Sequence, residues 1–153
     1  MSEPLRFGFD VACAADEAFR SWTEHIAAWW PRGHSSSGDP DTTVIIEPGV
    51  GGRLLERTSA GEEIVWGAIT AWEPPRRFAY LWHIGRSPDQ GTDVEIRFVE
   101  TGGTTRVEIE HGGWERLGDE GPAWREGNTR GWQRVLDPYN DYMAAHAAGT
   151  EER

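Results

Sequence analysis

Two neighbouring stretches of the sequence, residues 94–98 and 107–111, alternate apolar with charged side chains. Alternation with a period of two predicts a β-strand that has one apolar face. The Thr-Gly-Gly sequence at 101–103 lies between the two stretches and predicts a hairpin turn. This pattern is typical of an antiparallel sheet with one side in water. Because the apolar side must be buried, the pattern requires a second structural layer over the sheet.

The only stretch long enough to cover this sheet is a helix that we expect near the C-terminal end. Its larger side chains recur every three or four residues, which places them in one stripe. Pro138 lies inside the stripe, so either it kinks the helix, or Asp137 caps a new helix with Pro138 at its first position. The stripe consists of Trp124, Asn128, Trp132, Val135, Leu136, Tyr139 and Met143.

The first part of the chain predicts a strand followed by two short helices. Residues 5–11 alternate apolar and polar side chains, Asp16 is a suitable N-cap for the first helix, and Pro31 ends the second. Residues 32–43 are polar and turn-prone, and we interpret them either as a lid over one end of a cavity or as a plain flexible connection.

Further strands are expected between this loop and the hairpin, over 44–47, 53–58, 62–72 and 78–82. The order of elements predicts an α+β fold, in which a meander of antiparallel strands follows the short helices and precedes the long helix. We expect one domain over residues 1–148 and a frayed tail at 149–153.

Composition limits the partners that such a chain can have. The net charge is −11, and all 15 basic residues are Arg, so we expect binding neither to nucleic acid nor to an anionic membrane surface. No apolar stretch approaches the length of a membrane span and no hydrophobic segment opens the chain, which predicts no membrane insertion and a cytoplasmic location. The single cysteine, Cys13, allows no disulfide within the chain and is interpreted as a small buried hydrophobe.

Motifs for a metal, a cofactor or a catalytic nucleophile are missing from the sequence. The five His residues are scattered, with no metal-binding spacing between them and no second cysteine. The Gly-rich stretch at 48–52 lies between two expected strands, so a hairpin turn explains it better than phosphate binding does. We therefore expect no metal and no cofactor, and an enzymatic role is the less favoured interpretation.

Five segments, in order along almost the whole chain, resemble one known family. They read ADEAFRSWTEHIAAWWP, EPGVGGRLLE, WGAITAWEPPRRFAYLW, GGTTRVEIEHGGW and GWQRVLDPYNDYM. Together they resemble the SRPBCC superfamily, which has the START-like or helix-grip fold, and within it bacterial proteins with a domain like that of the heat-shock ATPase activator. The resemblance implies a curved sheet of about seven antiparallel strands wrapped around the long C-terminal helix, with a cavity between them that binds lipids, hormones or aromatic metabolites.

The inward faces of the sheet and the helix supply the candidate ligand-binding residues. The sequence has nine Trp residues, and Trp and Tyr rings carry a polar atom that needs a partner when buried, which favours a pocket wall. The alternative is that these residues only fill a core. The candidates are Trp66, Tyr80, Trp82, Phe98, Ile109, His111, Trp114, Trp132, Leu136 and Tyr139.

Histidines in this set and outside it are interpreted from their position in the pattern. His111 is in phase with an apolar strand face, so it is either a satisfied structural group or the best available general base. His83 follows Trp82 and should face water, and we expect His34 at the surface. Gly113 and Gly131 each precede a Trp, and we interpret both glycines as bends that bring Trp114 and Trp132 to the cavity mouth.

Three functions are compatible with these patterns. The first is binding of a small hydrophobic or aromatic molecule between the sheet and the C-terminal helix. The second is a cyclase or hydrolase on the same fold that uses His111 or an acidic residue in the pocket. The third is a module that interacts with a chaperone or regulator, which would need an exposed apolar patch. A homodimer is compatible with all three.

Overall fold

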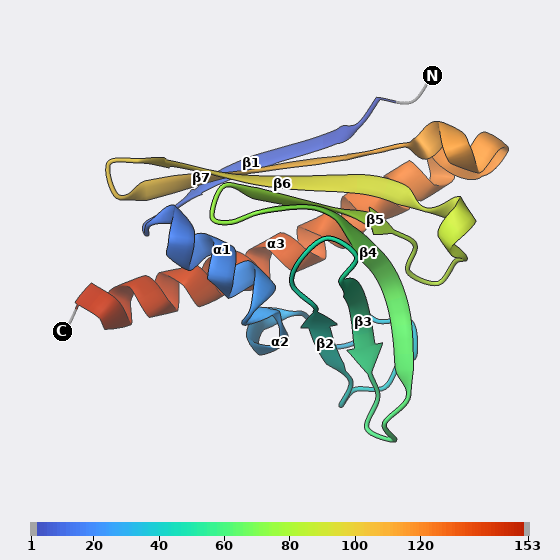
Figure 1. Cartoon of the computed structure of the whole chain (residues 1–153), viewed down its shortest axis with the longest axis horizontal. Helices are drawn as coiled ribbons and strands as arrows, with labels where there is room; N and C mark the ends of the chain where they lie inside the picture. Colours follow the sequence, from blue (N-terminus) through green and yellow to red (C-terminus); the bar gives the residue numbers. More distant parts are fainter. Residues whose placement is uncertain (1–2, 152–153) are drawn as a thin grey trace.

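The structure is a computed structural model that describes residues 3–151, with side chains described for residues 3–146 (Figure 1). Seven strands form one antiparallel sheet in the order β1-β7-β6-β5-β4-β3-β2. The sheet curls over a long helix, α3, which confirms the expected α+β helix-grip fold. The elements are β1 (Leu5–Val11), α1 (Ala15–Thr23), α2 (Ile26–Trp29), β2 (Thr43–Ile46), β3 (Arg53–Arg57), β4 (Glu63–Glu73), β5 (Arg77–Trp82), η1 (Pro88–Gln90), β6 (Thr92–Thr101), β7 (Thr104–Gly112), η2 (Trp114–Glu120) and α3 (Gly121–Glu151).

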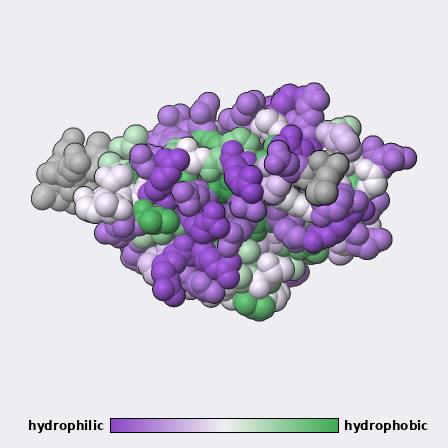
Figure 2. All heavy atoms as spheres, turned by 90° about the horizontal axis from the view of Figure 1, so that it is seen from above, coloured by the Kyte–Doolittle hydropathy of each residue, from purple (hydrophilic) through white to green (hydrophobic). Residues whose placement is uncertain are grey.

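The two faces of the sheet differ as the alternation in β6 and β7 requires. Val107 and Ile109 point to the core and are buried, whereas Arg106, Glu108 and Glu110, which alternate with them, carry charge and face outward. On the outer face the strands are joined by ion pairs such as Arg77–Glu95 at 2.7 Å and Arg97–Glu108 at 3.5 Å. Figure 2 shows the molecule from above the sheet, and most residues on that side are hydrophilic.

Helix α3 provides the cover that the one-sided sheet needs. Trp132, Val135, Tyr139 and Met143 from the expected stripe are buried against the sheet and α1. The helix runs through Pro138 without a break, so a separate helix beginning at that proline is wrong. Residues 152–153 of the tail that was expected to fray lie outside the described residues, and fraying of the tail stays a prediction. None of the helices in the described part of the chain combines the length and the apolarity needed to cross a membrane.

Helix α1 is anchored by a residue of β6, a strand that lies far from the helix in the sequence. Ala14 is its N-cap, so the prediction of Asp16 at that position is wrong by two residues. The free N–H of Ala15 donates to Glu100 Oε1 at 2.8 Å, because the end of β6 lies beside the start of the helix. Phe19 then packs edge-on against Phe78 and Phe98, which closes this end of the core.

Register shifts in β3 and β4 explain why the inward residues of that region are hard to identify from alternation. The pairing shifts between Leu54 and Leu55 and again between Ile69 and Ala71. Each shift changes which side of the sheet the next residue faces. Trp66 nevertheless faces inward and is buried, as proposed from the sequence.

Candidate functional site

One half of the space between the sheet and α3 is a filled core centred on His111. The side chain is fully buried, and both ring nitrogens are bound: Trp132 Nε1 donates to Nδ1 at 2.9 Å, and Nε2 lies 2.7 Å from Thr92 Oγ1. Because an indole N–H can only donate, Nδ1 is the acceptor and Nε2 carries the proton. Burial lowers the pKa of the imidazole from its ordinary 6.5 to about 3, so His111 is neutral near pH 7.

Trp114 completes this core from the side of η2. Its ring packs 4.4 Å from the His111 ring, and its Nε1 donates to the His111 carbonyl oxygen at 3.1 Å. Gly113 has φ +89°, a left-handed conformation that lets the chain turn from β7 into η2, as its proposed role as a bend requires. Trp114 itself is fully buried and packs behind His111, which is not the expected cavity mouth.

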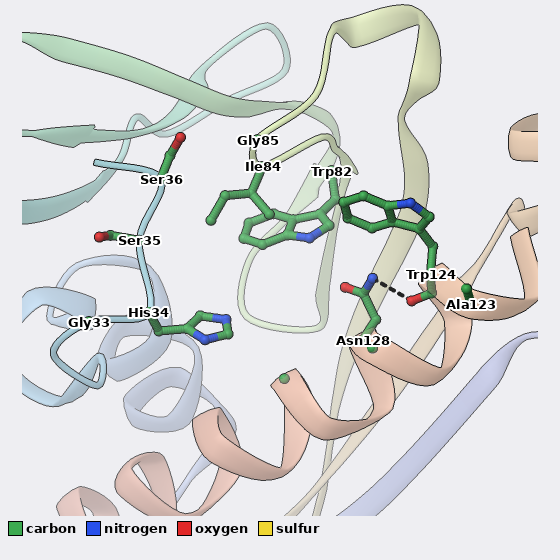
Figure 3. Close-up of a pocket in the computed structure, with 12 residues that line it drawn as sticks. Gly33, His34, Ser35, Ser36, Trp82, Ile84, Gly85, Ala123, Trp124 and Asn128 are labelled. Carbon is green, nitrogen blue, oxygen red and sulfur yellow. Dashed lines mark hydrogen bonds between the residues drawn. The ribbon is translucent and has the colours of Figure 1, made fainter. Parts of the chain in front are cut away.

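The other half of this space is an open cleft of about 580 Å³. Three segments form its walls: the loop after α2, the turn after β5, and the first half of α3 (Figure 3). A narrow extension of about 20 Å³ leads inward between Trp30, Tyr80, Trp82 and Trp132. The cleft is lined by Gly33, His34, Ser35, Ser36, Trp82, Ile84, Gly85, Ala123, Trp124, Gly127, Asn128 and Gly131.

The structure separates the proposed ligand-binding residues into two groups. Trp82 lines the open cleft, and Tyr80 and Trp132 border its narrow extension. Leu136 is half-buried on α3 and packs against the core. The others are buried side chains of the core or of its margin, and their role in binding stays a prediction: Trp66, Phe98, Ile109, His111, Trp114 and Tyr139.

Two histidines lie where the sequence pattern does not place them. His83 is 7 % exposed and its Nδ1 lies 3.1 Å from the Arg86 carbonyl oxygen, so the expectation that it faces water is wrong. Alternation does not apply to it because β5 ends at Trp82. His34 was expected at the surface, but its ring is half-buried and faces the cleft beside Trp30.

Small residues at every fourth position of α3 form the helix wall of the cleft and leave space beside it. Ala123, Gly127 and Gly131 recur every four residues and lie on the face that borders the cleft. A Cβ at Gly127 would meet nothing within 4 Å, and one at Gly131 would lie 3.4 Å from His34 Cε1. Gly131 lies inside α3, so its interpretation as a bend is wrong, and it instead leaves room for the histidine ring.

Glu56 fixes the loop wall of the cleft. Its buried carboxylate accepts hydrogen bonds from the backbone N–H groups of Ser36 and Ser37, from the hydroxyls of Ser37 and Thr42, and from Trp66 Nε1, over 2.6–3.1 Å. Burial by itself raises the pKa of this carboxyl, but these hydrogen bonds outweigh it, and the pKa lies below its ordinary value. An ionised carboxylate therefore connects β3, β4 and the loop.

Charged groups lie behind the cleft wall. The Arg86 guanidinium sits 4.3 Å from the centre of the Trp124 ring and pairs with Glu120 at 2.6 Å. None of the cleft-lining residues is Arg, Asp or Glu. Among the described residues, no group of three or more His, Cys, Asp and Glu side chains is arranged to hold a metal ion.

Comparisons with known proteins agree with this architecture. Txn09, described as an anthrahydroquino-γ-pyrone synthase, is 31 % identical over 92 % of this chain and 96 % of its own, with a TM-score of 0.62. CalC, a self-sacrificing resistance protein from Micromonospora echinospora, is 25 % identical over 94 % and 96 %, with a TM-score of 0.69. An AHSA1-like protein from Aeromonas hydrophila is 21 % identical over 94 % of both chains, with a TM-score of 0.62.

A comparison with curated protein sequences found no match. The model of one protein family, described as Activator of Hsp90 ATPase homolog 1-like protein, matches residues 12–144, which is most of the chain. The match includes the sheet from α1 onward, the cleft walls and most of α3, and it confirms the resemblance found in the sequence. The chain therefore belongs to the family of Activator of Hsp90 ATPase homolog 1-like proteins.

Proposed function

We propose that this protein binds a small hydrophobic or aromatic molecule in the cleft between the turn after β5 and the first half of α3. The observation that carries the proposal is the cleft itself, whose volume of about 580 Å³ is within the usual range of small-molecule sites. Trp82, Ile84 and Trp124 supply apolar wall, and His34 and Asn128 supply polar groups, which is the composition that such sites have.

The glycines in α3 support a functional reason for this space. Glycine inside a helix costs about 0.5–1 kcal/mol relative to alanine. At Gly127 a methyl group would meet no neighbour, so packing within the protein does not require glycine there. A ligand that lies against the helix backbone would explain the glycine, because any side chain at position 127 would project into the space of the ligand.

The name of one similar protein supports a ligand of aromatic type. Txn09 is described as a synthase of an anthrahydroquino-γ-pyrone, and it matches this chain over nearly its whole length. We extend from that name only the class of molecule, which is a fused, flat aromatic system. The aromatic walls of the cleft favour the same class.

Thermal unfolding in the presence of fatty acids, sterols, flavonoids and aromatic polyketides tests the proposal. A ligand present at about a hundred times its dissociation constant should stabilise the protein by about 2.7 kcal/mol. For a chain of this size that corresponds to a rise in the unfolding midpoint of roughly 5–10 °C.

Two variants of Gly127 locate the binding. Gly127→Leu should remove the shift, because the leucine side chain would occupy the cleft, whereas the smaller methyl group of Gly127→Ala should reduce the shift only in part. An absence of any shift across the panel would count against the proposal, as would a shift that Gly127→Leu leaves unchanged.

The enzymatic alternative gains no specific support from His111. Both of its ring nitrogens already have partners, and the side chain does not line the open cleft. An interaction with a chaperone or regulator likewise has no observation in its favour on the charged outer face of the sheet.

A further inference from the structure

We infer that the cleft selects an uncharged, planar aromatic ligand that carries a hydroxyl group, and that Asn128 and His34 recognise its polar atoms. The inference rests on the proposed binding function and narrows its class of ligand. The cleft should therefore bind phenolic ring systems in preference to fatty acids, whereas a purely apolar cleft would accept both classes equally well.

Asn128 presents a hydrogen-bond acceptor to the cleft. Its Nδ2 donates to the Trp124 carbonyl oxygen at 2.8 Å. Since a carbonyl oxygen can only accept, this bond fixes the orientation of the amide and turns Oδ1 away from the helix backbone. Within the part of the chain that the structure describes, no donor bonds Oδ1, and Figure 3 shows the amide facing the cleft. A ligand hydroxyl is the simplest group that would donate to it.

His34 presents a donor and an acceptor from the facing wall. The loop backbone is held in place, because His34 N–H donates to Pro31 O at 3.2 Å and Trp30 Nε1 donates to the His34 carbonyl oxygen at 2.7 Å. The ring packs 5.3 Å from the Trp30 ring and points into the cleft (Figure 3). Among the described residues, neither ring nitrogen has a hydrogen-bond partner.

The protonation state of His34 favours an uncharged ligand. Burial and the nearby positive charge of Arg134 lower the pKa of the ring, so it is neutral near pH 7. A neutral ring offers one N–H, which suits a ligand carbonyl or hydroxyl oxygen, and it offers no cation for a carboxylate.

The remaining lining also disfavours an anionic ligand. Arg86 lies behind Trp124 and is already paired with Glu120, and no Arg lines the cleft itself. A carboxylate placed here would lose water, and no residue of the cleft lining carries a positive charge to pair with it, because Arg134 is not part of that lining. The carboxylate of a fatty acid therefore finds no charged partner in the cleft lining. A neutral phenol loses less hydration on binding, and its hydroxyl gains a hydrogen bond to Asn128 Oδ1.

The flat shape follows from the rings that border the cleft. Trp82 and Trp124 both line the cleft, and Figure 3 shows their rings above His34 and Asn128. Arg86 stacks on the Trp124 ring and holds it in place. Stacked and edge-on aromatic pairs are stabilised beyond the effect of their buried area alone, and a flexible alkyl chain does not supply this gain.

Isothermal titration calorimetry with flavone, its monohydroxylated derivatives and palmitate tests the inference at a pH below the pKa of the phenols. The tightest hydroxyflavone should bind about tenfold more tightly than flavone, which is the effect of one hydrogen bond. Palmitate should show no binding at concentrations that saturate the protein with the hydroxyflavone.

Two shape-conserving variants separate the roles of the polar groups. Asn128→Leu should reduce the preference for the hydroxyl to less than about twofold while leaving flavone affinity nearly unchanged. His34→Phe keeps a ring against Trp30 and should weaken flavone and hydroxyflavone equally, by about three- to tenfold, because both ligands contain the carbonyl oxygen. Circular dichroism of each variant checks that the fold is retained.

The outcomes distinguish this inference from the proposed function. The inference would be overturned if the preference for the hydroxyl survives Asn128→Leu. It would also be overturned if palmitate binds as tightly as the hydroxyflavones and Gly127→Leu abolishes that binding. Either result would leave a cleft-binding function standing. If no probe binds the unmodified protein, and the wider ligand panel also leaves the unfolding midpoint unchanged, both fail together.

Discussion

The two halves of the space between the sheet and α3 are built from similar aromatic residues, but one half is a filled core and the other is an open cleft. Around His111 every polar atom of the histidine ring has a partner and the surrounding Trp rings are buried. Around Asn128 and His34 the same helix and sheet leave a cleft, and polar atoms face it without protein partners in the described residues. Buried polar groups in native proteins are normally hydrogen-bonded.

This difference indicates which half is structural and which is available to a ligand. Removing the side chains of the filled half should destabilise the protein, because their contacts are with the protein itself. Removing the side chains of the open half should change the free energy of unfolding little and the affinity for a ligand more.

The largest contrast is expected between Trp132→Ala and Trp124→Ala. Trp132 is 8 % exposed and donates to His111, so its loss should cost about 3–5 kcal/mol of stability. Trp124 is half-buried at the cleft, and the same truncation should cost about 1–2 kcal/mol. Urea unfolding of both variants measures the difference. Equal losses would mean that the two halves are packed alike.

Acid should weaken the filled half before the carboxylates titrate. Unfolded His111 binds its proton near its ordinary pKa of 6.5, whereas in the folded protein the pKa is about 3. Between these values the unfolded state binds more protons, so the stability that is fully present above pH 6.5 falls with the pH. From pH 6.5 to 4.5 the loss should be about 2–3 kcal/mol.

Denaturant unfolding across this pH range measures the loss, and His111→Gln should flatten it. His34 also has a lowered pKa, so His34→Phe is the control for its share of the slope. A slope that is unchanged in His111→Gln would assign the acid sensitivity to other groups.

A smaller effect is expected at the buried carboxylate that holds the loop wall. Glu56→Gln keeps an oxygen for the three N–H donors of Ser36, Ser37 and Trp66, and the hydroxyls of Ser37 and Thr42 can rotate to accept from the new amide. The loss of charge in these bonds should cost about 1–2 kcal/mol. The same change at exposed Glu63 should have little effect, and an equal cost at both positions would contradict the proposed anchoring.

The smallest effect compares two glycines of α3. Gly127→Ala should stabilise the protein by about 0.5–1 kcal/mol, because the methyl group enters open space and favours the helix. Gly131→Ala should gain less, since its methyl group would meet the His34 ring at 3.4 Å. Thermal unfolding measures both, and a destabilised Gly127→Ala would indicate that the cleft is narrower than described.

Sequence patterns predicted the fold well where the pattern is local. One-sided alternation identified β6 and β7, and the three-to-four spacing identified α3, because each element must turn its apolar side toward the same core. The pattern was less useful in β4, where a register shift changes the face of later residues, and at His83, which lies beyond the end of β5. The N-cap of α1 was misplaced because its stabilising acceptor, Glu100, is distant in sequence.

The candidate site shows the same division. The sequence by itself determined an aromatic-rich sheet covered by one helix, since periodicity and composition follow from local chemistry and the need to bury apolar surface. Only the tertiary structure decided which rings fill the core and which border a cleft, and it brought His34, Glu56 and Asn128 into one site. The physical reason is that space and hydrogen-bond partners depend on side chains from distant segments, which no local pattern records.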